Sequence, residues 1–184
     1  TGIDILGVEF IGFGPVGEAS EASDKVREAV KTFLDRNPIG ANDRVAVALP
    51  GYTAFSRFIK LPTVDPKKID EMVRYEAQQQ IPFPIEEVNW DYQLLDPDPD
   101  EPDEREIGIF AIRQELLAGF LSELRVQGIE PDLVTIASLS IYNFVKYNQE
   151  LDGAAVIVDI GAEHTDLVII DGPRFWIRSL RIAG

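Results

Sequence analysis

Two apolar runs separated by a short polar turn constrain the fold of this chain more than any other feature. Residues 154 to 172 read AAVIVDIGAEHTDLVIIDG, and both flanks are nearly continuous Val, Ile and Leu. Such runs are typical of strands buried on both faces. We therefore expect a strand over residues 154–160, a tight turn over 161–164, and a second strand over 165–170 that ends in an Asp-Gly turn.

The turn between these strands is the best candidate for a functional site. It carries a dense group of polar residues around a glycine: Asp159, Gly161, Glu163, His164 and Thr165. A glycine at such a turn lets backbone N–H groups approach a ligand closely. A plain hairpin with no further role is the alternative, and this stretch alone does not decide between the two.

Composition excludes several classes of function. The chain of 184 residues contains no cysteine and one histidine, which excludes disulfides, thiol catalysis, thiolate metal sites and multi-histidine metal sites. A net charge of -15 argues against a nucleic-acid partner. No apolar run approaches the roughly 20 residues of a membrane-spanning helix, and no signal peptide opens the sequence. We expect a cytoplasmic protein without direct membrane insertion.

The first part of the chain predicts an α/β opening. Strand-like residues at the N-terminus precede a helix that Ser20 or Ser23 could cap, and residues 44–49 (RVAVAL) predict a buried strand. The run from Gly12 to Gly17 has the spacing of a dinucleotide fingerprint. The expected helix does not start at its last glycine, so plain strand and turn is the preferred interpretation.

The middle of the chain predicts a separate small unit. Residues 55–136 contain strand, helix, strand, strand, helix and strand signals, the order of a split βαβ module with both helices on one face. Asp65 and Pro66 predict the start of its first helix, and Gly128 the end of its second. Glu76 is expected either in water or paired with Arg57 or Lys60. Residues 96–106 (DPDPDEPDERE) predict a solvated, mobile hairpin loop.

The segment RYEAQQQIPFPIEEVNWDYQLL, residues 74–95, resembles the PilM family of actin-like ATPases of type IV pilus assembly, whose architecture is similar to that of FtsA. Further matches are ALPGYTAFSRFIKLP, the Gly128-Ile129-Glu130-Pro131 turn and Val158-Asp159-Ile160-Gly161. The resemblance covers the chain from about residue 40 to its end.

The resemblance implies a fragment of an α/β, actin-like (ribonuclease-H-like) fold with an inserted βαββαβ subdomain of the 1C type. Subdomain 1A would comprise residues 1–55 and 137–150, subdomain 1C residues 56–136, and residues 151–184 would begin subdomain 2A. It also implies an assembly platform on the cytoplasmic face of the inner membrane. Its partners would be the N-terminal cytoplasmic peptide of PilN, held in a groove between 1A and 1C, and other pilus assembly proteins.

The resemblance further implies that the turn after residue 158 is the second phosphate loop of an ATP site. The implied nucleotide-binding residues are Asp159, Gly161, Ala162, Glu163, His164 and Thr165, with Asp159 near magnesium through water. The family's first phosphate loop is absent unless residues 2–7 are a degenerate form of it, and its adenosine motif lies beyond residue 184. We therefore expect ATP and magnesium to bind the full-length protein, and this fragment weakly or not at all.

Two functions from different classes stay open at this point. The preferred one is a nucleotide-dependent assembly platform with at most weak ATPase activity. The alternative is an actin-like phosphotransferase or ATP hydrolase with genuine turnover. The sequence offers neither a sugar-binding loop nor a serine motif near His164, which favours the platform.

Overall fold

A computed structural model of the chain describes residues 7–12, 19–148 and 153–182. The chain divides into two compact units, the first made of residues 1–45 and 119–132 and the second of residues 46–118 and 133–184. The glycine-rich runs 2–7 and 12–17 fall almost entirely outside the described residues.

The first unit is built on two helices. Helix α1 (Ala19–Arg36) begins before both serines that the sequence offers as caps, so Ser20 and Ser23 lie inside the helix and the predicted cap is wrong. Ala19, Glu21 and Ala22 are good helix formers and extend it. Arg27 Nη2 of α1 lies 2.6 Å from Glu123 Oε2 of helix α3 (Gln114–Val126), whose last turns belong to this unit.

Helix α3 ends at Gly128 as the sequence predicts. Gly128 has a φ of 77°, its N–H donates to Arg125 O, and Ile129 N–H donates to Leu124 O. These are the two hydrogen bonds of a Schellman motif, which requires a left-handed residue after the helix. Leu124 and Ile129, which occupy the two positions of the apolar contact that often accompanies this motif, are both buried.

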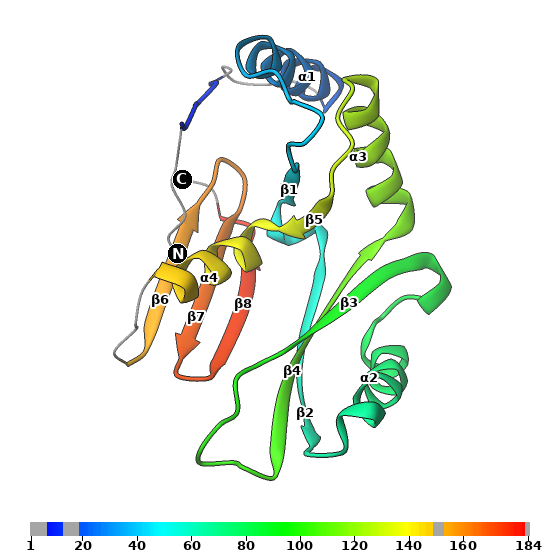
Figure 1. Ribbon diagram of the computed structural model, residues 1–184, viewed down its shortest axis with the longest axis vertical. Coiled ribbons are helices and arrows are strands. Elements are labelled where there is room, and N and C mark those ends of the chain that lie inside the picture. The colour runs from blue at the N-terminus through cyan, green and yellow to red at the C-terminus, as the bar shows by residue number, and fades with distance from the viewer. Residues whose placement is uncertain (1–6, 13–18, 149–152, 183–184) are drawn as a thin grey trace. The chain divides into compact units, whose positions relative to one another are not determined.

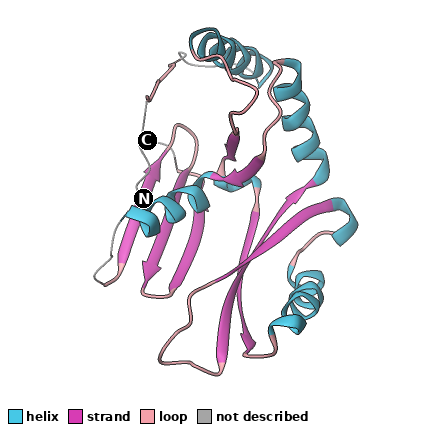
Figure 2. Cartoon of the chain, viewed as in Figure 1, coloured by secondary structure: helices cyan, strands magenta, loops and turns pink. Residues whose placement is uncertain are grey.

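The described part of the second unit contains three small sheets (Figures 1 and 2). A parallel pair joins β1 (Ala46–Leu49) to β5 (Leu133–Ile136). An antiparallel sheet has the order β2-β4-β3, formed by β2 (Phe55–Pro62), β3 (Val88–Leu94) and β4 (Glu104–Arg113). A second antiparallel sheet, in chain order, is formed by β6 (Ala155–Ile160), β7 (Thr165–Asp171) and β8 (Arg174–Leu180).

Besides the start of α3, the other elements among the described residues of this unit are two helices and two short 3-10 turns. They are α2 (Pro66–Gln80), α4 (Ala137–Asn148), η1 (Gly51–Thr53) and η2 (Ile85–Glu87). Asp65 caps α2 as predicted, because its Oδ1 accepts a hydrogen bond from Lys67 N and proline occupies the first helical position. Of the two alternatives for Glu76, the structure does not form the pairing with Arg57 or Lys60, since Arg57 donates to Gln80 and Lys60 to Glu101.

One element of the predicted split βαβ module pairs elsewhere. The strand, helix, strand, strand, helix, strand order is as predicted, but β5 pairs with β1 and not with the β2-β4-β3 sheet. Asp132 explains this, since its N–H donates to Val45 O and its Oδ2 accepts from Val45 N, both at 2.8 Å. These bonds set residues 133–136 beside β1 and shorten the strand expected from Ile129.

Two hydrophobic cores hold the second unit together. The face of the β2-β4-β3 sheet that carries Ile107 and Ile109 packs against Val73 and Ala77 of α2. The other core joins α4, β7, β8 and the opposite face of that sheet, and its members include Leu95, Ile136, Tyr142, Val168, Ile170, Phe175 and Ile177. The β2-β4-β3 sheet is therefore covered on both faces, and α4 lies against the β6-β7-β8 sheet (Figure 1).

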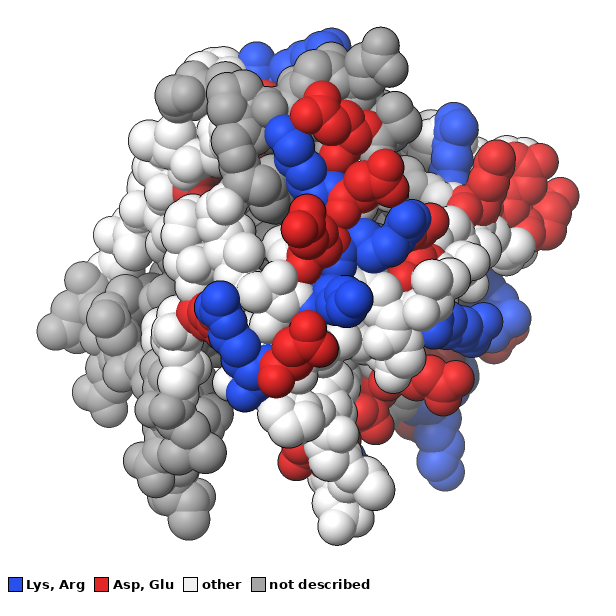
Figure 3. Space-filling model, turned by 90° about the horizontal axis from the view of Figure 1, so that it is seen from above, with Lys and Arg blue, Asp and Glu red and all other residues white. Residues whose placement is uncertain are grey.

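No helix among the described residues is long and apolar enough to cross a membrane. Acidic and basic side chains are interspersed on the face that Figure 3 presents.

Candidate functional site

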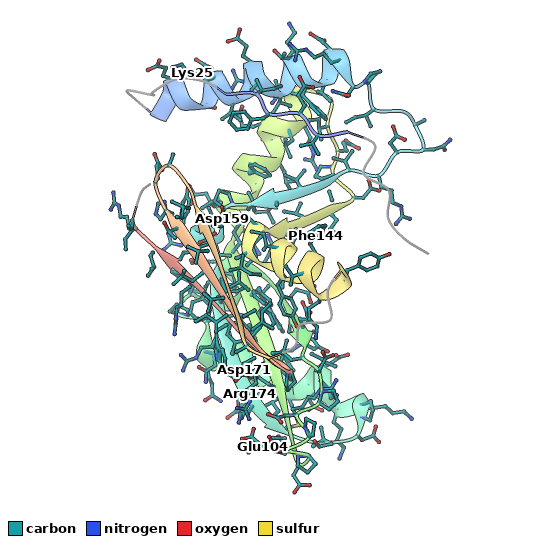
Figure 4. The ribbon with its side chains drawn as sticks, turned by 90° about the vertical axis from the view of Figure 1, so that its left-hand side faces the viewer. Lys25, Glu104, Phe144, Asp159, Asp171 and Arg174 are labelled. Atoms are coloured by element: carbon teal, nitrogen blue, oxygen red, sulfur yellow. The ribbon has the colours of Figure 1, made fainter. Side chains whose placement is uncertain are left out.

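The predicted polar turn forms as a tight connection between β6 and β7. Ile160 pairs with Thr165, and Gly161 N–H donates to His164 O across the turn at 2.9 Å. A Cβ on Gly161 would lie 2.8 Å from that same oxygen, so this closure requires a glycine. Ala162 and Glu163 are exposed at the tip, and Asp159 is exposed at the end of β6 (Figure 4).

The turn also rests on the η1 turn that follows β1. The His164 and Tyr52 rings stack with centroids 3.9 Å apart and an angle of 16° between their planes. His164 is half-buried, and its Nδ1 is buried without a hydrogen-bond partner in the structure. The aromatic stack thus fixes the position of the candidate phosphate turn.

Strand register separates the predicted site residues onto two faces. Asp159 lies directly opposite Asp166, and Thr165 lies opposite Ile160. Because neighbouring residues of a strand point to opposite faces, Thr165 faces away from Asp159 and Asp166. Its hydroxyl donates to Ile182 O at 2.8 Å, so this predicted phosphate ligand already has a partner in the chain.

Asp166 is a site residue that the sequence analysis did not identify. The residue is 8% exposed, and its carboxylate accepts a hydrogen bond from Ser179 Oγ and lies against Gly51 of η1. A usable signal was present, because Pro50-Gly51 follows the apolar run that predicts a strand, and ligands of α/β proteins bind at the carboxyl ends of parallel strands. The structure pairs this strand, β1, in parallel with β5, although only Leu49 of β1 is buried. Asp159 and Asp166 therefore place two carboxylates on one face beside a glycine turn.

The residues present fit a phosphate and magnesium only in part. The turn offers the exposed carboxylate of Asp159 and the backbone amides of Ala162 and Glu163, whereas the Gly161 amide and the Thr165 hydroxyl are already bonded. The Glu163 side chain adds negative charge beside the phosphate position. No group of three or more potential metal ligands is present among the residues that the structure describes.

A second candidate site is a groove in the second unit, with a cavity volume of about 390 Å³. Consecutive residues of β3, from Asn89 to Gln93, form one wall, and all of β5 forms another. Leu139 and Asn143 of α4 contribute to the lining. In terms of the predicted subdomains, the lining comes from both 1A and 1C.

Comparison with known proteins gives a consistent result. The family model described as type IV pilus assembly protein PilM matches residues 3–183. Among solved structures, a chain of the "PilM-PilN type IV pilus biogenesis complex" is 30% identical with a TM-score of 0.70, covering 90% of this chain and 50% of that chain. No curated protein matches the chain.

A second solved structure shares the fold at lower identity. The cytoplasmic domain of EpsL, an inner-membrane component of the type II secretion system of Vibrio cholerae, is 14% identical with a TM-score of 0.53, covering 85% of this chain and 56% of that domain. The chain thus spans about half the length of the structures it matches. The predicted α/β, actin-like fold is confirmed.

Proposed function

This chain belongs to the family of the type IV pilus assembly protein PilM, and on that premise we propose that it is an actin-like assembly platform of a type IV pilus or a related secretion machine. The observation that carries the proposal is the likeness, over 90% of this chain, to a chain of the PilM-PilN complex. The proposed partner is the N-terminal cytoplasmic peptide of a PilN-type inner-membrane protein. Binding such a peptide would hold the protein on the cytoplasmic face of the inner membrane, among other pilus assembly proteins.

We propose that the peptide occupies the groove between β3, β5 and α4. Both strands are sheet edges, because β3 ends the β2-β4-β3 order and β5 pairs only with β1 among the described strands. Edge strands expose unpaired N–H and C=O groups, which an extended peptide can bond while its side chains enter pockets. The apolar lining, which includes Phe110, Ile136 and Leu139, suits apolar peptide side chains.

The open edge of β3 is partly blocked by its own side chain. Tyr92 N–H donates to Asp91 Oδ1 at 2.8 Å, so this amide is not bonded to β4 and faces the groove. Trp90 presents its N–H and C=O on the same edge, since backbone groups alternate along a strand. Asp91 is also the only charged side chain among the groove residues in the described part of the chain. It favours a basic residue in the peptide.

Calorimetric titration of the chain with a PilN-type N-terminal peptide tests the proposal. We expect saturable one-to-one binding that Asp91→Lys weakens by about tenfold or more, because it replaces an attraction by a repulsion inside the groove. Glu71→Lys makes the same charge change on α2 outside the groove and should leave the affinity unchanged. No binding by the wild-type chain would refute the proposed role as an assembly platform. Equal peptide affinities of all three proteins would refute the placement of the peptide in the groove.

We propose that nucleotide contributes to this function in a protein of the length of the matched relatives. Asp159 would face magnesium through water, and the backbone amides of Ala162 and Glu163 would face the phosphates, with Gly161 and His164 closing the turn. Magnesium would supply the positive charge that offsets part of the negative charge of Asp159 and of the ATP phosphates. Since the Gly161 amide and the Thr165 hydroxyl are bonded within the chain, this chain alone should show no saturable ATP binding at millimolar concentrations. Tight binding, lost in Asp159→Ala, would overturn that expectation.

A further inference from the structure

The connection between β3 and β4 is a structured segment that the proposed function does not use. We call residues 96–103 the acidic strap; its acids are Asp96, Asp98, Asp100, Glu101 and Asp103, and prolines separate several of them. Glu101 N–H donates to Asp98 O at 3.1 Å, and Thr63 N–H donates to Asp103 O at 2.8 Å. Prolines fix φ and stiffen the chain, so the strap has little freedom to relax when its contacts change.

Cations from three different elements hold the strap. Lys146 Nζ of α4 lies 2.7 Å from Asp96 Oδ2, and Arg174 Nη2 of β8 lies 2.5 Å from Asp98 Oδ2. Lys60 of β2 pairs with Glu101. The sequence predicts a solvated, mobile hairpin loop here, but ion pairs tie the segment to α4 and to the β7–β8 hairpin. Figure 4 shows Arg174, Asp171 and Glu104 near the same end of the unit, away from Asp159.

The central pair is the most sheltered. The side chain of Asp98 is 15% exposed and that of Arg174 is 33% exposed. The N–H of Asp100, and then the Arg174 guanidinium, hold the pKa of the Asp98 carboxyl below its usual range. A sheltered pair is screened by salt less than an exposed one, so the strap retains this contact at physiological ionic strength.

The strap also bridges the two walls of the groove. Gln93 of β3 and Asn143 of α4 both line the groove, and Asp96 and Lys146 lie three residues further along the same two segments. The ion pair between Asp96 and Lys146 therefore connects one wall to the other at the end of the groove. Any widening of the groove that moves α4 from β3 must stretch or break this contact.

We propose that the acidic strap is a conformational latch that sets the width of the groove through its ion pairs with α4 and the β7–β8 hairpin. The effect of the latch on peptide binding rests on the proposed function, because the groove is the proposed peptide site. Charge added to or removed from the strap or its cations changes how often the groove opens.

A charge swap tests the latch without any peptide. Because the chain has no cysteine, spin labels can be placed on cysteines introduced at Lys68 of α2 and Arg178 of β8, both exposed and outside the strap and groove. The distance distribution is measured for wild type, Asp96→Lys, Lys146→Glu and the double variant carrying both changes. Lys67→Glu is the control, since it reverses an exposed lysine on α2 that lies outside the strap.

Each single reversal should broaden the distance distribution, and the double swap should restore it. Partly exposed pairs of this kind change an opening equilibrium by about fivefold or less, so the open population should rise by up to that factor in each single variant. Distributions equal to wild type in both single variants, or broadening that the double swap does not reverse, would overturn the latch. The outcome is independent of the peptide titration, because the labels need no PilN-type peptide. They report the separation of α2, which packs on the β2-β4-β3 sheet, from β8, which packs against α4.

Discussion

Substituting Gly51 by alanine tests the packing of the candidate site most directly. A Cβ at this position would lie 2.5 Å from Asp166 Oδ2 and 2.9 Å from its Cγ, whereas ordinary contacts are 3.4–4 Å. The carboxylate must therefore move by roughly 1 Å if the backbone stays in place. It is buried and accepts a hydrogen bond from Ser179, so the movement strains the packing and weakens that bond.

The expected loss of stability has two contributions, the overpacking around the new methyl group and the weakened Ser179–Asp166 hydrogen bond. Overpacking a buried site costs about 1–3 kcal/mol, and weakening a hydrogen bond to a charged group adds up to about 1.5–3 kcal/mol. We expect Gly51→Ala to lower the free energy of unfolding by about 2–4 kcal/mol. Guanidinium denaturation followed by tryptophan fluorescence measures it, since Trp90 and Trp176 both lie in the second unit.

Two comparisons make the experiment decisive. Gly119→Ala is the same chemical change in α3, where a Cβ meets nothing within 4 Å, so it should be neutral or stabilise by up to about 1 kcal/mol. In an Asp166→Ala background the contacting carboxylate is absent, and the cost of Gly51→Ala should fall below about 1 kcal/mol. An unchanged cost in that background would show that Asp166 does not oppose the new methyl group, and the assignment of this contact would be wrong.

Three further substitutions have expected outcomes. Glu106→Gln should stabilise the chain at neutral pH and have less effect near pH 4. Burial raises the pKa of the Glu106 carboxyl, so the stability that depends on the protonated group is lost as pH rises through the folded-state pKa. Equal effects of the substitution at both pH values in urea titrations would contradict this. Gly128→Ala should destabilise by about 1–2 kcal/mol, since a φ of 77° is unfavourable for a side chain, and hydrogen exchange of the last turn of α3 should increase. Phe175→Ala should cost about 3–5 kcal/mol in thermal unfolding, because the ring is fully buried and stacks on Tyr142 at 3.9 Å; a loss under 1 kcal/mol would mean that the site repacks.

Elements whose signals are local in the sequence were predicted well. Helix α2 runs from Pro66 to Gln80 as expected, because an Asp-Pro cap and a Pro-Phe-Pro stop act within a few residues of each end. The Schellman end of α3 at Gly128 is of the same kind. The partner of β5 was predicted incorrectly, because Asp132 and Val45 are distant in sequence and nothing local indicates their hydrogen bonds.

The candidate site was predicted only in part, because it too depends on contacts between residues that are distant in the sequence. The turn over residues 161–164 follows from composition, but the face on which each side chain lies depends on strand register. Thr165 and Asp166 are neighbours in the sequence, and only the pairing of β6 with β7 shows that Asp166 shares the face of Asp159. The Gly51 turn and Ser179 join this cluster from elements that are remote in the chain.

The acidic strap shows what composition cannot determine about a charged segment. Seven acids and one arginine in residues 96–106 indicate mutual repulsion and solvent exposure. That inference treats the segment as isolated, whereas its cations come from positions 60, 146 and 174. Three cations cannot neutralise all the acids, so repulsion persists within the strap while attraction holds its ends. A segment held by a balance of attraction and repulsion responds to a single change of charge. The proposed latch requires this property.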